Sequence, residues 1–175
     1  VYNTQISNTL NHCLYVEGGH VDVNNSTIAQ FYPFDGNRRS AIGFKAPIDT
    51  LDVRNSLVTG YGNDEVLWTP VEEEPLKFSF DHCVLRTEKM MTEDSLRFTH
   101  VVYEDVKDTT MYGEKHFSVF DTENLIYDFH LSAKSAAIGA ADPKTALPYD
   151  RNGLKREEDK ADAGCFLYRE EKKEE

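Results

Sequence analysis

One eight-residue pattern occurs three times in this chain and constrains its fold more than any other feature. The copies occupy residues 21–28 (VDVNNSTI), 51–58 (LDVRNSLV) and 78–85 (FSFDHCVL). Apolar and polar residues alternate over the first three positions of each copy, which predicts a short strand. The fifth position is Asn or His, and Asn tolerates the left-handed conformation, so we expect the chain to turn a corner there. A second short strand follows each corner.

The spacing of the copies predicts a solenoid. They begin at residues 21, 51 and 78, and a repeat of this size is typical of folds whose turns bury apolar faces by stacking on each other. Another apolar run precedes each copy, at residues 13–16, 41–44 and 65–68, which makes three short strands per turn. Because parallel crossovers are nearly always right-handed, we predict an all-β fold: a right-handed parallel β-helix, a single-chain solenoid with three short strands per lap. A β-sandwich would not readily repeat the polar corner at one offset.

Side-chain alternation predicts which residues stack in the interior. The expected columns are Val21, Leu51 and Phe78; Val23, Val53 and Phe80; Ile28, Val58 and Leu85; and the small residues Ser26, Ser56 and Cys83. At the corner itself we expect Asn25 and Asn55 to hydrogen-bond from lap to lap. His82 takes the same position in the third copy and would interrupt that ladder.

Composition argues against several classes of partner. The 31 acidic residues against 19 basic ones give a net charge of −12, which disfavours nucleic acid and anionic membrane surfaces. No run approaches the roughly 18 apolar residues of a membrane span, so no transmembrane segment is expected. Cys13, Cys83 and Cys165 are sparse and lack CxxC spacing, so we expect buried free thiols.

The end of the chain carries a series of short motifs in a fixed order. They are DFHL at residues 128–131, SAAIGA at 135–140, PYDRNG at 148–153, Arg156, and ADAGCF at 161–166. This order resembles the carboxy-terminal portion of secreted bacterial, Bacteroidetes-type right-handed parallel β-helix proteins of the pectin-lyase-like superfamily. The chain departs from that pattern at Ala136, where the family usually has Pro, and in its last motif, where the family usually has IGAY.

The resemblance implies a domain organisation and a location. We expect β-helix laps over residues 1–127, an irregular carboxy-terminal cap over 128–167 that folds across the last lap, and a charged tail over 168–175. Because the chain opens on strand-like sequence, we expect further laps to precede Val1 and the open amino-terminal lap to self-associate. The implied location is extracellular, periplasmic or on the outer surface, with a lipid anchor in a preceding segment as one possibility.

The repeat fades between residues 87 and 124, where we expect irregular laps with strands at 96–103 and 116–120.

The resemblance leaves the question of enzyme activity open. The superfamily includes polysaccharide lyases, glycoside hydrolases, esterases, adhesins and scaffolds, and its enzymes typically place their working groups outward on the first strand of each lap. Here the outward residues would be Tyr15, Gly43 and Leu67, none of which is a usual acid, base or metal ligand. We therefore expect the parent protein to be a lyase or hydrolase whose active laps lie elsewhere, or a protein that only binds, and we expect the 175 residues alone to be inactive.

The flanking loops supply candidate carbohydrate-binding residues. A guanidinium matches the geometry of a carboxylate, so Arg38 and Arg39, with Lys45 in the same lap, could clamp an acidic sugar. Tyr61 and Trp68 could stack against a pyranose ring. The alternatives are a solvated loop in which the arginines pair with nearby aspartates, and a Trp68 that fills the interior.

Metal and cofactor motifs are weak. The six histidines show no HxH or HExxH spacing, so no metal site is predicted. Asp64 and Glu65 are adjacent and should diverge on a strand. The run Asp150-Arg151-Asn152-Gly153 has a calcium-like appearance, but it lacks the rest of a calcium loop and is better interpreted as a turn; no cofactor is expected.

Two functions remain after these arguments. The first is glycan or polysaccharide engagement, as the distal non-catalytic end of a polysaccharide lyase or glycoside hydrolase-like protein. The second is a non-catalytic adhesin or cell-surface scaffold. A groove formed by Arg38, Arg39, Lys45 and Trp68 would favour the first, and a smooth acidic surface over those laps would favour the second.

Overall fold

The computed structural model describes residues 1–89, 96–108 and 110–170, and within these ranges the regular structure is almost entirely β. The single helix among the described residues is a short 3₁₀ turn, η1 (Gly113–His116), so no described helix is long and apolar enough to cross a membrane. The strands are β1 (Gln5–Ser7), β2 (Leu14–Glu17), β3 (His20–Asn24), β4 (Thr27–Gln30), β5 (Ile42–Lys45), β6 (Ile48–Arg54), β7 (Leu57–Gly60), β8 (Val66–Thr69), β9 (Leu76–Asp81), β10 (Val84–Leu85), β11 (Phe98–Thr99), β12 (Val102–Tyr103), β13 (Phe117–Asp121) and β14 (Ile126–Leu131).

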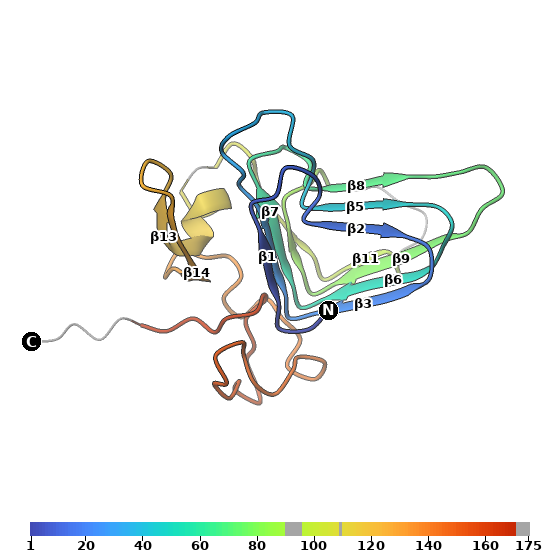
Figure 1. Cartoon of the computed structure of the whole chain (residues 1–175). Coiled ribbons are helices and arrows are strands. Elements are labelled where there is room, and N and C mark those ends of the chain that lie inside the picture. Colours follow the sequence, from blue (N-terminus) through green and yellow to red (C-terminus); the bar gives the residue numbers. More distant parts are fainter. Residues whose placement is uncertain (90–95, 109, 171–175) are drawn as a thin grey trace, which may run out of the picture.

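Twelve of these strands form three parallel sheets, with the orders β2-β5-β8, β3-β6-β9-β11 and β1-β4-β7-β10-β12. Consecutive strands belong to different sheets, and the chain visits the three sheets in the same order from β2 to β4, from β5 to β7 and from β8 to β10. The sheets lie on three sides of one apolar core (Figure 1). The predictions of an all-β fold and of parallel pairing are confirmed, and the cyclic order of the sheets is compatible with the predicted three strands per turn.

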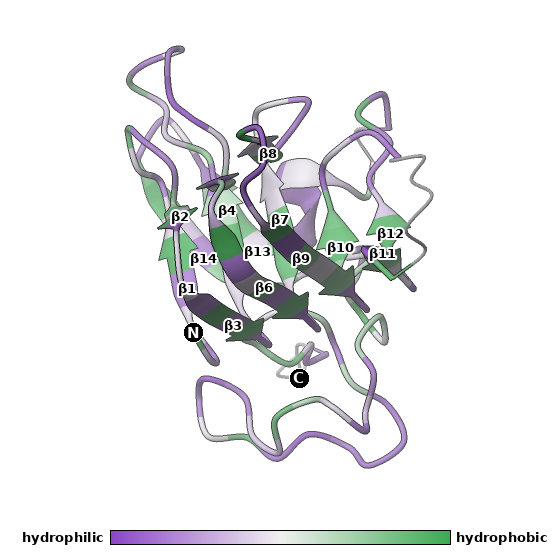
Figure 2. Cartoon of the chain, turned by 90° about the vertical axis from the view of Figure 1, so that its right-hand side faces the viewer, coloured by the Kyte–Doolittle hydropathy of each residue, from purple (hydrophilic) through white to green (hydrophobic). Residues whose placement is uncertain are grey.

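Register within the sheets confirms the predicted interior columns. Val23 pairs with Val53 and Val53 with Phe80, and all three are completely buried. The columns that contain Leu51 and Val58 are formed by the same pairings. Apolar residues concentrate in the strands, whereas the connecting loops are mostly hydrophilic (Figure 2). The period-two pattern therefore identified the residues that hold neighbouring turns together through burial.

The structure corrects two boundaries. Residues 96–103 do not form one strand, because His100 adopts a left-handed conformation (φ 52°) and divides the segment into β11 and β12. At the amino end, β1 pairs with β4 and was not predicted. The sequence signal for it is the run from Asn3 to Ile6 (NTQI), which matches the corner and strand at residues 25–28 (NSTI).

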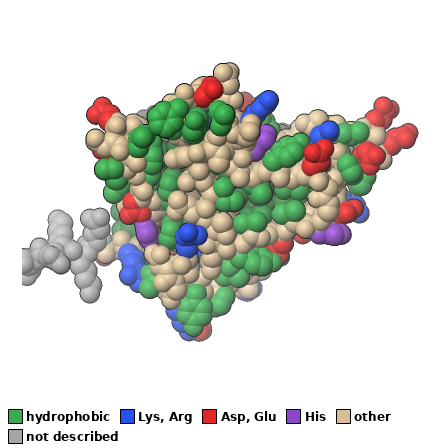
Figure 3. Space-filling view, in the orientation of Figure 1, with side chains coloured by type: hydrophobic (Ala, Val, Ile, Leu, Met, Phe, Trp, Pro, Cys, Tyr) green, Lys and Arg blue, Asp and Glu red, His purple; other side chains and the backbone are tan. Residues whose placement is uncertain are grey.

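Hydrophobic side chains lie between β2 and β3 at the end of the stack that faces the viewer in Figure 3. Leu10, in the loop that leads into this turn, is 49% exposed. Self-association through this end stays a prediction.

The hairpin of β13 and β14 lies outside the three sheets and is antiparallel. Its Phe117 and Phe120 pack with Phe31 and Tyr61 at ring-centroid distances of 4.7 to 6.4 Å. This second apolar cluster covers the outer face of the five-stranded sheet. The predicted strand at 116–120 is confirmed apart from its first residue, which belongs to η1.

The irregular segment from residue 132 onward also packs on the outside of the five-stranded sheet. Ala161, Ala163 and Cys165 are buried there against side chains of β4 and β7. Gly164 fits closely: its φ is +99°, and a Cβ atom would lie 2.7 Å from Thr27 Oγ1. We expected this segment to cross the last lap, and it lies instead along the side of the first laps (Figure 1). All three cysteines are free, with Cys83 and Cys165 buried as predicted and Cys13 partly buried.

The corner positions of successive turns form a single column, which we call the corner column. Its members are Asn3, Asn25, Asn55, His82 and His100. All five residues have φ between 46° and 52°, the left-handed region in which Asn is tolerated best. The prediction that Asn25 and Asn55 turn the chain is confirmed.

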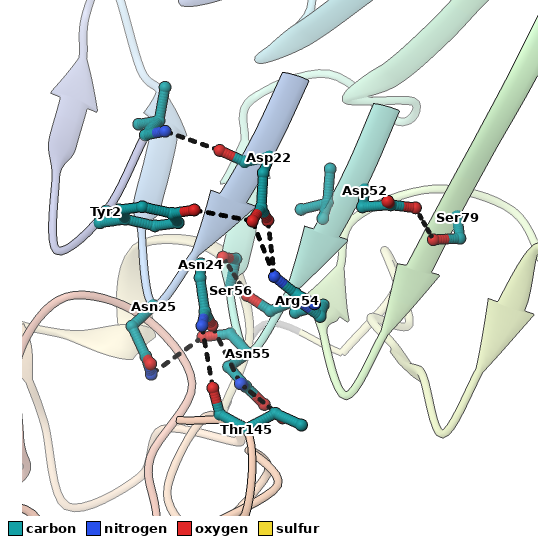
Figure 4. Close-up of polar contacts among 12 residues, drawn as sticks. Tyr2, Asp22, Asn24, Asn25, Asp52, Arg54, Asn55, Ser56, Ser79 and Thr145 are labelled. Carbon is teal, nitrogen blue, oxygen red and sulfur yellow. Dashed lines mark hydrogen bonds and ion pairs between the residues drawn. The ribbon is translucent and has the colours of Figure 1, made fainter. Parts of the chain in front are cut away.

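The carboxy-terminal segment covers the three asparagines of the corner column. Asn55 Nδ2 donates to Thr145 Oγ1 at 3.1 Å, and the neighbouring Asn24 Nδ2 donates to the Thr145 carbonyl at 2.9 Å (Figure 4). Asn25 and Asn55 also hydrogen-bond from lap to lap as expected: Asn25 Nδ2 donates to the Asn55 carbonyl at 3.5 Å, and Asn55 Nδ2 donates to Asn24 Oδ1 at 3.0 Å. Three further contacts join Asn3 Nδ2 to the Tyr149 carbonyl, the Leu147 N–H to Asn25 Oδ1, and the Asp142 N–H to Asn55 Oδ1, at 2.8, 2.7 and 2.8 Å.

Candidate functional site

A cleft of about 410 Å³ lies on the outer face of the β2-β5-β8 sheet. Its floor is the outward row Tyr15, Gly43 and Leu67, which the register places side by side. Tyr15 and Leu67 are 49% and 47% exposed, as expected for outward residues. The loops at residues 36–40 and 62–65 form its walls.

His12 covers the middle of this floor. Its ring lies directly over Gly43, where a Cβ atom would come within 2.4 Å of His12 Cε1, and it stacks on Tyr15 with ring centroids 5.2 Å apart. Nδ1 lies 2.9 Å from Ser40 Oγ and 3.2 Å from the Ser40 carbonyl oxygen. Since the Ser40 hydroxyl donates to the Ile42 carbonyl, Nδ1 carries the hydrogen and Nε2 has the lone pair.

The charge state of His12 follows from its surroundings. Burial lowers the pKa of His12, the nearby Arg39 lowers it further, and the Ser40 backbone acts in the opposite direction. The imidazole is therefore neutral at pH 7. It offers the cleft a flat ring and one acceptor nitrogen.

Glu65 is a buried carboxylate at the wall of the cleft. It is 1% exposed, and its two oxygens accept hydrogen bonds from the Gly62 and Ala41 N–H groups at 2.6 and 2.7 Å. Burial raises the pKa of Glu65 to about 7, although these bonds and two arginines act against it. Gly60 is required beside it, because a Cβ atom there would lie 2.2 Å from Glu65 Oε1. The side chain thus fixes the two loops that form the cleft.

Two of the five predicted carbohydrate-binding residues lie in the cleft, Arg38 and Arg39. The Arg38 guanidinium lies 5.0 Å from the centre of the Tyr61 ring, a cation–π contact. The Arg39 side chain is exposed, and within the described part of the chain it forms no ion pair. The nearby aspartates have other partners: Asp35 accepts a bond from the Asn37 N–H, and Asp49 lies 3.9 Å from His20.

The other three predicted residues lie elsewhere. Lys45 Nζ is 3.4 Å from Glu17 Oε1 at the end of β5. Trp68 points into the core, where its ring stacks on Phe44 at 5.8 Å, which is the alternative that the sequence left open. Tyr61 packs into the second apolar cluster and reaches the cleft only through its contact with Arg38.

No protein-family model, curated protein or solved structure matches this chain.

A second polar cluster lies at the far end of the corner column. His82 Nδ1 and His100 Nδ1 each lie 3.0 Å from Asp81 Oδ1, and the two imidazole rings stack at 4.3 Å. Three groups of these types could hold a metal ion, since their ligand atoms all lie within 4.8 Å of one another. Sequence reasoning missed this cluster because it searched for short local spacings, whereas one turn of the chain separates the two histidines.

Glu104, His116 and Ser135 form a buried hydrogen-bonded triad with the residue types of a hydrolytic site. The distances are 3.0 Å from His116 Nε2 to Glu104 Oε1 and 2.8 Å from His116 Nδ1 to Ser135 Oγ. His116 is fully buried and Ser135 is 6% exposed, so a substrate has no access to the hydroxyl. The triad therefore links the residue after β12, the η1 turn and the carboxy-terminal segment.

The run at residues 150–153 forms a turn, as predicted. Asp150 Oδ1 accepts bonds from the Asn152 and Leu154 N–H groups at 2.9 and 2.8 Å, and Oδ2 accepts one from the Leu167 N–H at 3.1 Å. Both carboxylate oxygens therefore serve the backbone. The calcium-like appearance of the sequence comes from the turn itself.

Proposed function

We propose that this chain belongs to a right-handed parallel β-helix of the pectin-lyase-like type and that it binds an acidic glycan in the cleft on the β2-β5-β8 sheet. The fold part of the proposal is supported by the cyclic order of the three sheets and by the motifs at residues 128–166. The binding part is supported by one observation above all: Arg39, a cation with no ion pair among the described residues, stands beside a flat, half-exposed floor.

The chemistry of the cleft suits a negatively charged sugar. A guanidinium can bind a carboxylate or sulfate through two parallel hydrogen bonds. The stacked rings of His12 and Tyr15 offer an apolar surface to the face of a pyranose, and the neutral Nε2 of His12 can accept a bond from a hydroxyl. Because the rest of the chain is strongly acidic, with a net charge of −12, a local pair of arginines would restrict an anionic polymer to this one face.

The arrangement favours binding over bond cleavage. A glycosidase needs two carboxyl groups that both reach the substrate. Here both oxygens of Glu65 are engaged by backbone N–H groups, and Asp64 Oδ1 accepts bonds from Thr87 Oγ1 and the Glu88 N–H. We therefore propose a non-catalytic role, as the glycan-binding end of a larger polysaccharide-degrading protein.

Calorimetric titration with oligogalacturonate and with a neutral glucan of equal length tests this function. We expect binding of the acidic oligomer only, reduced on the order of tenfold or more in Arg39→Ala. Lys45→Ala is the matched control, because it removes the same charge outside the cleft and should bind as the parent does. A chain that binds no acidic glycan, or that loses affinity equally in both variants, would favour the adhesin or scaffold function instead.

A further inference from the structure

The corner column changes character after its third member. Its first three positions are asparagines, which the carboxy-terminal segment covers, and its last two are His82 and His100. The hydrogen bonds of residues 142–149 to the column reach no further than Asn55 in the described structure. The histidine side chains are 25% and 68% exposed, so this end of the column is open to solvent while the other end is closed.

The Nδ1 atoms of His82 and His100 both lie 3.0 Å from Asp81 Oδ1. The same oxygen, Asp81 Oδ1, also accepts a hydrogen bond from Thr99 Oγ1 at 2.6 Å, while the two imidazole rings stack on each other. His82 Nδ1 is buried and has no hydrogen-bond partner of good geometry, although it lies 3.0 Å from that oxygen. Two imidazole nitrogens that converge on one carboxylate, one of them unsatisfied, form an incomplete polar arrangement.

We propose that Asp81, His82 and His100 form a binding site for a divalent cation of the Zn²⁺ type, which joins two successive turns at the open end of the corner column. Imidazole nitrogen and carboxylate oxygen are the ligands that Zn²⁺ takes in proteins, at roughly 2.0 to 2.2 Å. Ligand atoms around a tetrahedral ion at such distances lie about 3.3 Å apart. The two nitrogen–oxygen separations of 3.0 Å seen here are close to this value, and all three ligand atoms lie within 4.8 Å of one another, so rotation of the side chains would bring them around one ion.

The backbone fixes the relative positions of the three ligand residues. His82 and His100 both hold the left-handed corner conformation, with φ of 50° and 52°, and the register pairs Asp81 with Thr99. Arg54, the cationic neighbour of Asp81 in the sheet, is engaged by Asp22 at 2.8 Å. Three protein ligands would leave at least one coordination position for water or for a ligand from outside the chain.

The test is titration of the untagged, chelator-treated chain with ZnCl₂, followed by calorimetry, and with CoCl₂, followed by visible absorption. We expect one ion per chain, visible absorption bands for bound Co²⁺, and no binding of Ca²⁺, which prefers oxygen ligands. Saturating Zn²⁺ should raise Tm by on the order of 5 °C at 100 times Kd.

His82→Asn and His100→Asn are the decisive variants, because Asn is the residue that this same column uses at its other corners. Each should fold, as judged from its melting curve without metal, and should lower the Zn²⁺ affinity by on the order of 100-fold or more. His20→Asn is the matched control, since His20 is an exposed histidine outside the cluster. The absence of binding at millimolar Zn²⁺, or an affinity that falls as much in His20→Asn as in the column variants, would overturn the proposal.

Discussion

The covered and open ends of the corner column share one left-handed backbone conformation but differ in the contacts of their side chains. At Asn25 and Asn55 the side-chain oxygens accept N–H groups of the carboxy-terminal segment and are completely buried. At His82 and His100 the rings face each other and the solvent. The same left-handed corner thus serves as an attachment point for an irregular segment at one end and as a side-chain cluster at the other. What lies over a corner, and not the corner itself, decides its role.

The largest effect should come from a covered corner. Asn55→Ala removes the acceptor for the Asp142 N–H, removes two donated bonds and places Ala at a φ of 49°. Left-handed strain, an unsatisfied part-buried N–H and the two lost donated bonds together predict a loss of about 3 to 5 kcal/mol in the free energy of unfolding. Chemical denaturation would measure it. His82→Ala should cost only about 1 to 2 kcal/mol, the strain alone; equal losses at the two positions would contradict the comparison.

Glu65 satisfies two backbone N–H groups with a carboxylate, where Asn55 uses an amide, and this predicts a pH dependence. Burial raises the pKa of Glu65 from 4.5 to about 7, so the folded chain binds the proton more tightly than the unfolded chain does. Its contribution is complete below about pH 4.5 and is lost as the pH rises to about 7, by about 3 kcal/mol. Denaturation curves between pH 5 and 7.5 should show this decline in the parent chain.

Glu65→Gln is the control for that decline. The amide of Gln keeps one acceptor oxygen and does not titrate, as is true of the amides of Asn25 and Asn55. The free energy of unfolding of this variant should therefore vary less over the same pH range. A decline of equal size in Glu65→Gln would assign the pH dependence to other groups.

The attachment of the carboxy-terminal segment can be weakened without touching the column. Gly164→Ala places a Cβ atom 2.7 Å from Thr27 Oγ1 at a φ of +99°, and we expect a loss of about 2 to 3 kcal/mol in the free energy of unfolding. Gly153→Ala is the matched control, because its φ is +78° and nothing lies within 4 Å of the added atom. It should cost about 1 to 2 kcal/mol, from strain only. Thermal melts of the two variants would separate contact from strain.

The smallest change in the free energy of unfolding should come from replacing a histidine at the open end of the column by the asparagine found at the covered end. His82→Asn in the metal-free chain keeps a residue that tolerates φ of 50° and removes no buried partner. We expect the free energy of unfolding to change by less than about 0.5 kcal/mol. A loss as large as that of Asn55→Ala would mean that the open end is as tightly integrated as the covered end.

The sequence predicts the core of this molecule well because the core depends on local alternation. Val53 could be placed between its neighbours since period two fixes its face and the repeat fixes its lap. The run Phe98-Thr99-His100 carries the same signal as Phe80-Asp81-His82, but its corner lies within the alternating segment 96–103, which was interpreted as one strand. For Trp68 the sequence left two alternatives, a surface position that stacks on a sugar and a position in the core. Alternation with Val66 favours the core, where the structure has it.

The sequence predicts the surface poorly because the surface depends on contacts between distant irregular segments. His12 reaches the cleft only because a glycine stands at residue 43 one lap later. The path of residues 142–149 over the asparagines follows from single hydrogen bonds that span more than 80 residues of chain. No periodic pattern encodes such contacts, so the cleft and the covered corners could be recognised only from the structure.

Native-state hydrogen exchange of two amide protons tests the central claim most directly. The Asp142 and Leu147 N–H groups donate to Asn55 and Asn25, although both belong to a segment without regular secondary structure. If the asparagine corners hold that segment, exchange at both sites should be slowed on the order of 1,000-fold or more, an opening free energy of about 4 kcal/mol. Asn55→Ala should release the Asp142 proton first. Rapid, unprotected exchange of both protons in the parent chain would contradict the account.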